Sequence, residues 1–138
     1  IVPLLRPTID AMAPTTEPDR VDSYATTAGV LYVRVAAGAA ADFTVFDGTK
    51  LHAERAGGSL SLGLDGGAEF QSGAQFEVIA SGAAPTGVTA DGAALVEAAS
   101  LAALEGGESG WFFDSAVGGT LYLRVGAKSH TIEATFSQ

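Results

Sequence analysis

Residues 110–125 read GWFFDSAVGGTLYLRV: three aromatics, an Asp, a turn of small residues and then an alternating run. Successive side chains of a strand point to opposite faces, so Trp111 and Phe113 share one face and Phe112 takes the other. A pair of large rings on one face is typical of a sandwich core, where aromatic burial dominates the packing energy. The stretch therefore predicts a β-hairpin with a buried aromatic face.

The same period of two runs through residues 30–35 (VLYVRV), with the aliphatic side chains on one face and Tyr32 and Arg34 on the other. Asp-Gly and Gly-Gly pairs between such runs supply the positive φ that tight hairpin turns need. We predict an all-β fold, an antiparallel β-sandwich with Gly-rich hairpins over residues 29–138. The other predicted strands are residues 42–46, 51–55, 59–64, 75–80, 110–114, 120–125 and 130–136.

Two segments depart from this pattern. Residues 1–28 hold four of the five prolines, which predicts an extended Pro-rich connector or arm with one short strand at 2–5. AALVEAASLAAL (93–104) consists of helix formers, and Gly106-Gly107 would end a helix there. We predict one short helical insertion near 94–104. Its apolar face would hold Leu95, Ala98, Ala99 and Ala102.

The negative net charge of the chain indicates which classes of partner to expect. Seven Lys and Arg stand against 16 Asp and Glu, a formal net charge of −9 among 138 residues. A negative field repels nucleic acid and anionic lipid, so we expect neither nucleic acid nor a membrane as partner. The absence of cysteine excludes disulfides and thiolate chemistry.

Few residues are candidates for chemistry. His52 and Glu54 share one strand face, although a solvated polar face explains the pair more economically than a ligand site does. His52 and His130 lack a third ligand at a metal-binding spacing, and Gly107–Gly110 does not complete a G-x-S-x-G motif. We therefore predict no catalytic, cofactor or metal site. The acids beside turns are expected to form those turns: Asp47, Asp65, Asp91 and Asp114.

A solvated aromatic face would be a binding surface. One Trp and three Tyr are a thin supply for a dedicated carbohydrate binder, so core packing is the favoured role of the rings. The candidate carbohydrate or partner surface consists of Tyr32, Phe112, Tyr122, His52 and Glu54.

Several phrases, in order along the chain, resemble the C-terminal β-sandwich region of glycoside hydrolase family 31, the α-glucosidase-like enzymes. They are IVPLLRPTID (1–10), LYVRVAAGAAADFTVFDG (31–48), GVTADGAAL (87–95), GWFFDSAVGGTLYLRV (110–125) and HTIEATF (130–136). Family members usually carry a longer acidic turn where this chain has Phe46-Asp47-Gly48. The catalytic carboxylates of the family belong to a barrel that these residues do not include, so the resemblance transfers no catalytic residue.

The resemblance implies a non-catalytic accessory β-sandwich, a piece of a longer protein that packs against or stabilises a catalytic barrel. Two alternatives remain open from the sequence. One is a structural subunit that assembles with copies of itself by strand or arm exchange. The other is a carbohydrate-binding module. We expect an extracellular or cell-envelope location.

Overall fold

The computed structural model describes residues 1–4, 29–36, 38–79 and 81–137. The predicted arm over 1–28 lies outside the described residues except for its first four. The elements are β1 (Val2–Leu4), β2 (Val30–Ala36), β3 (Ala41–Thr44), β4 (Lys50–Ala56), β5 (Ser59–Asp65), β6 (Gly73–Ile79), β7 (Gly87–Ala90), β8 (Ala93–Ala94), α2 (Leu101–Glu105), β9 (Gly110–Asp114), β10 (Thr120–Val125) and β11 (His130–Thr135).

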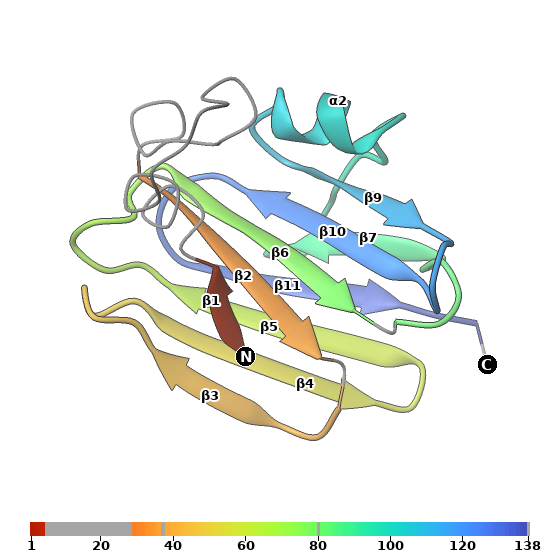
Figure 1. Cartoon of the computed structure of the whole chain (residues 1–138), viewed down its shortest axis with the longest axis horizontal. Coiled ribbons are helices and arrows are strands. Elements are labelled where there is room, and N and C mark those ends of the chain that lie inside the picture. Colours follow the sequence, from red (N-terminus) through yellow and green to blue (C-terminus); the bar gives the residue numbers. More distant parts are fainter. Residues whose placement is uncertain (5–28, 37, 80, 138) are drawn as a thin grey trace, which may run out of the picture.

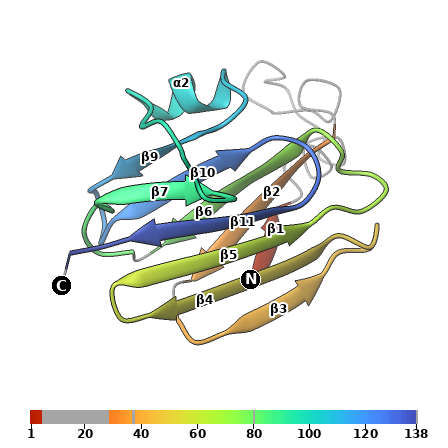
Figure 2. The ribbon, with the colours of Figure 1, turned by 180° about the vertical axis from the view of Figure 1, so that it is seen from behind.

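The strands form two layers, as Figures 1 and 2 show from opposite sides. One sheet has the order β1-β2-β6-β10-β9 and the other has the order β3-β4-β5-β11-β7-β8. The predicted all-β sandwich is thus confirmed. All pairings are antiparallel except β2 with β6, which is parallel. The chain visits the second sheet through β3, β4 and β5 between those two strands, so a hairpin does not dictate their relative direction.

The core fills the space between the inner faces of the two sheets. Val33, Phe76, Leu123 and Trp111 lie side by side across the first sheet, and all four are buried. The second sheet contributes its own buried side chains, which are Leu51, Ala53, Leu60, Leu62, Leu64, Val88, Ile132 and Ala134. Trp111 is only 7% exposed and belongs to this cluster. The predicted inward orientation of the Trp111 ring is therefore confirmed.

The helical prediction over 94–104 is correct only at its end. Helix α2 covers Leu101–Glu105 and begins at Ser100, whose side chain accepts a hydrogen bond from the Ala103 N–H. It ends at Gly106, as the sequence predicts. The preceding residues pair with strands instead. The Ala98 N–H donates to the Trp111 carbonyl and the Trp111 N–H donates to the Val96 carbonyl. These tertiary hydrogen bonds override the local helix propensity.

The hairpin of β7 and β8 was not among the strands predicted from the sequence. Asp91 and Gly92 both have positive φ, 51° and 83°, and form its two-residue turn. Asp-Gly at such a turn is a recognised hairpin signal, so the signal was present in the sequence. The strands themselves are too short to show a clear alternation. No helix of the described part is long and apolar enough to cross a membrane.

Replacing the buried indole will test the core assignment. We expect Trp111→Ala to lower the free energy of unfolding by about 3–5 kcal/mol, because the substitution leaves a ring-sized cavity. Urea unfolding followed by far-ultraviolet circular dichroism measures the change, since the variant lacks the only Trp of the chain.

Val96→Ala is the matched control, because this neighbouring side chain is 77% exposed. Its free energy of unfolding should stay within about 0.5 kcal/mol of the wild type. Equal effects of the two substitutions would contradict the assignment.

Candidate functional site

The five residues of the predicted surface do not meet in one place. Phe112 and Tyr122 lie on the outer face of the first sheet, whereas His52 and Glu54 lie on the outer face of the second. Tyr32 is 4% exposed. The prediction that Tyr32 belongs to an open surface is therefore wrong. Strand alternation places the ring on the outer face of the sheet, but other parts of the protein cover it there.

A cross-strand row on the first sheet brings the two remaining aromatics together. In register across β2, β6, β10 and β9 the row runs Arg34, Glu77, Tyr122 and Phe112. The Phe112 and Tyr122 rings stack with centroids 6.3 Å apart. Arg34 pairs with Glu77 at 3.2 Å between Nη2 and Oε2. The two rings were predicted from the sequence, but the ion pair was not. Arg34 and Glu77 are aligned by the parallel pairing of β2 with β6, which joins strands that are distant in sequence.

In the adjacent row on the same face, the polar side chains form hydrogen bonds within the protein. The Arg124 guanidinium donates to the side-chain oxygen of the buried Gln75 at 2.9 Å, and the Gln75 amide donates to the Glu105 carboxylate at 3.3 Å. Arg124 also donates to the Gly107 carbonyl. This network ties α2 to the sheet, and α2 lies over β9 and β10 (Figure 1).

On the second sheet His52 sits between two acids. Its Nδ1 lies 2.8 Å from Oδ1 of Asp42, and its Nε2 lies 3.7 Å from Oε2 of Glu54. The row Asp42, His52, Gly63 and Thr131 crosses the sheet, and Gly63 leaves a shallow cavity of about 260 Å³ beside the imidazole. The hydrogen bond with Asp42 outweighs burial and raises the pKa of His52 above 6.5, with the charges of both acids contributing.

The four turn aspartates are all used in hydrogen bonds. Asp65 accepts from the Ser129 hydroxyl, and Asp114 accepts from the Ala116 N–H. Asp91 accepts from the Thr131 N–H and lies 2.6 Å from Nδ1 of His130, and these two contacts lower its pKa. All four acids thus have structural roles, as expected, but only Asp114 and Asp47 bond within their own turns. Asp65 and Asp91 instead bond residues of the 129–131 segment, which is distant in sequence.

Asp47 makes the largest set of these bonds. Its carboxylate accepts from the Thr49 N–H and hydroxyl and from the N–H groups of Glu69 and Phe70. Burial alone would raise its pKa, but the four hydrogen bonds outweigh burial and the pKa is lowered. A Cβ atom on residue 67 would lie 2.6 Å from the main-chain oxygen of Asp47, which is too close, so only glycine fits against this turn.

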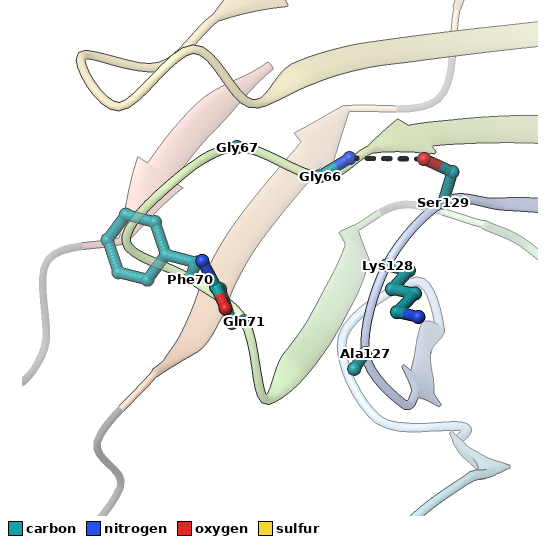
Figure 3. Close-up of a pocket in the computed structure, with 7 residues that line it drawn as sticks. All are labelled: Gly66, Gly67, Phe70, Gln71, Ala127, Lys128 and Ser129. Carbon is teal, nitrogen blue, oxygen red and sulfur yellow. Dashed lines mark hydrogen bonds between the residues drawn. The ribbon is translucent and has the colours of Figure 1, made fainter.

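Next to this turn is a cavity of about 400 Å³ between the β5–β6 and β10–β11 connections (Figure 3). The Gly66 N–H donates to the Ser129 hydroxyl across it, and Phe70 and Lys128 lie on opposite sides. The cavity contains no carboxylate among its lining residues, so it lacks the acid pair of a glycosidase. No group of three or more His, Asp or Glu in the described residues could hold a metal ion.

Comparison with known proteins gives similar structures but no sequence relatives. No protein-family model and no curated protein matches the chain. The cycloalternan-forming enzyme from Listeria monocytogenes, solved with a pentasaccharide substrate, has 21% identity and a TM-score of 0.64 over 77% of this chain. The GH31 dextranase of Flavobacterium johnsoniae, complexed with glucose, has 13% identity and a TM-score of 0.59 over 77% of this chain.

The match spans only a small part of each enzyme. This chain corresponds to 10% of the cycloalternan-forming enzyme and 16% of the dextranase. At these identities the likeness establishes the fold. The resemblance to the β-sandwich region of family 31 glycoside hydrolases, predicted from the sequence, is thus confirmed as a likeness of fold.

The His52–Asp42 pair makes stability depend on pH. Because the folded-state pKa of His52 lies above its unfolded value of 6.5, the pair stabilises the fold fully below pH 6.5. That contribution is lost as the pH rises through the folded-state pKa. We expect Asp42→Asn to lower the pKa of His52 in an NMR titration and to flatten this pH dependence. Asp114→Asn, which changes a carboxylate of the other sheet, is the control and should leave the pKa of His52 unchanged.

The Asp47 turn gives a second test. We expect Asp47→Ala to destabilise the domain by about 1–3 kcal/mol, because it leaves several donors without an acceptor. Asp114→Ala, which removes one bond to Ala116, is the control and should cost less. The Asp47 contribution is present above pH 3.8 and should be lost as the pH falls through the lowered folded-state pKa. Urea unfolding at several pH values measures both, and equal costs would contradict the assignment.

Proposed function

We propose that this chain is a non-catalytic accessory β-sandwich of a family 31 glycoside hydrolase, packed against a catalytic barrel that these residues do not include. The observation that carries the proposal is the extent of the structural match, which takes in 77% of this chain but 10% and 16% of two enzyme chains. A domain-sized portion of a much larger enzyme is the expected scale of an accessory unit.

The lowered pKa values of two carboxylates support a non-catalytic role. Glycoside hydrolysis requires a carboxylic acid with a raised pKa that protonates the leaving group, facing a second carboxylate across the scissile bond. Asp47 and Asp91 instead have lowered pKa values, because Asp47 accepts hydrogen bonds from several backbone N–H groups and Asp91 bonds the Thr131 N–H and the His130 side chain of β11. A carboxylate held ionised in this way is a poor proton donor.

An exposed aromatic supports contact with a neighbouring domain. Phe46 is 79% exposed and packs edge-to-face on Phe70, with ring centroids 5.9 Å apart. The Asp47 hydrogen bonds hold both backbone segments behind these rings. A ring presented by a rigid turn loses little conformational entropy when a partner covers it, which favours association.

The proposal predicts no turnover by the chain alone. Incubated with aryl α-glucosides, maltotriose and isomaltotriose, the purified chain should release product at the rate of the buffer blank. An α-glucosidase assayed in parallel shows that the substrates are competent. Turnover above the blank that a single carboxylate substitution abolishes would overturn the proposal.

A further inference from the structure

A cleft of about 620 Å³ lies beside Trp111, where edges of the two sheets approach each other. Strand β9 is the edge of the first sheet, and β7 and β8 form the edge of the second. The chain between β8 and α2 joins them, and Glu97 forms an isolated bridge with Trp111. The cleft therefore lies where the edges of the two sheets meet. Glu133 and Thr89 line it from the outer face of the second sheet, the face that also carries Glu54.

The walls of the cleft are held by hydrogen bonds. The Leu95 N–H donates to the Val88 carbonyl at 2.9 Å, and the Trp111 indole N–H donates to the Leu95 carbonyl at 3.2 Å. On the other side the Thr86 N–H donates to the Thr135 carbonyl at 2.7 Å. A ligand would therefore meet a preformed shape, which reduces the entropy lost on binding.

The rim of the cleft carries polar side chains that make no hydrogen bond or ion pair within the described residues. Glu97 and Glu133 are exposed, and within the described part of the chain neither carboxylate makes an ion pair or a hydrogen bond. The hydroxyls of Thr89 and Thr135 are likewise without a bond there. This contrasts with Asp47, Asp65, Asp91 and Asp114, which all accept hydrogen bonds within the fold.

The floor of the cleft is apolar. It is formed by Leu95 together with Val88 and Trp111, of which only 3% and 7% remain exposed. An apolar floor beneath hydrogen-bonding groups matches a pyranose ring, which offers C–H groups on its face and hydroxyls around its edge. Carboxylates form strong charge-assisted hydrogen bonds with such hydroxyls.

From this arrangement we infer that the Trp111 cleft binds a neutral oligosaccharide, with Glu97 and Glu133 accepting hydrogen bonds from sugar hydroxyls. No Lys or Arg lines the cleft, and the net charge is −9, so an anionic glycan would be repelled. The inference does not depend on the proposed accessory role, since a sandwich can hold this site with or without a catalytic partner.

Maltotriose and isomaltotriose are the probes for a titration of the whole chain. Trp111 is the only Trp, so its fluorescence emission reports on the cleft directly. We expect both the emission and the amide NMR signals of Thr89, Glu97 and Glu133 to shift with one or both sugars. Trigalacturonate, an anionic trisaccharide, should produce no shift.

Two substitutions test the carboxylates. Glu133→Ala and Glu97→Ala should each weaken binding about tenfold or more, the loss expected for a charge-assisted hydrogen bond. Glu108→Ala, an exposed acid outside the cleft, is the matched control and should bind as the wild type does. All three acids are exposed, and unchanged urea unfolding curves will show that the fold is intact.

The inference is overturned if neither sugar shifts these signals, if the two carboxylate variants bind as the wild type does, or if the shifts fall on Phe112 and Tyr122 instead. The turnover assay does not involve this cleft. Failure here would therefore leave the proposed accessory function standing, and turnover there would leave the sugar-binding result standing.

Discussion

The burial of Trp111 at the seam between the two sheets is the constraint on which the rest of the structure depends. Its ring belongs to the core, its N–H and carbonyl bond to Val96 and Ala98, and its indole N–H bonds to Leu95. One residue thereby sets the path of the chain from the second sheet to α2 and back to β9. The same contacts shape the cleft. The packing of Trp111 therefore underlies both the core and the proposed sugar site.

The polar side chains fall into two groups. Several are occupied within the described part of the fold: Arg34 with Glu77, Arg124 with Gln75, and Asp47 with the turn around it. Such groups stabilise the sandwich and are not available to a ligand. The carboxylates beside Trp111 have no such partners in the described residues. This difference, rather than the mere presence of acids, is what separates a candidate binding surface from scaffold.

Sequence reasoning succeeded where the signal was local and failed where distant segments competed. Alternation predicted the strands and the inward ring of Trp111, and Ser100 to Gly106 do bound a helix. The helix does not extend back to residue 94, because residues 95–98 gain hydrogen bonds to other strands. Likewise, alternation placed Tyr32 on the outer face but could not foresee that the ring would be covered.

The sequence by itself determined the class of fold, because a period of two with glycine at the turns leaves little choice but packed antiparallel hairpins. It also predicted that the turn aspartates are structural, since a short acid at a turn competes for backbone N–H groups. Asp47 and Asp114 do so locally, whereas Asp65 and Asp91 bond a segment that only the fold brings near. Only the tertiary structure decided which acids remain without a partner and where they gather. Glu97 and Glu133 are 36 residues apart and meet at one cleft solely through strand pairing and the burial of Trp111.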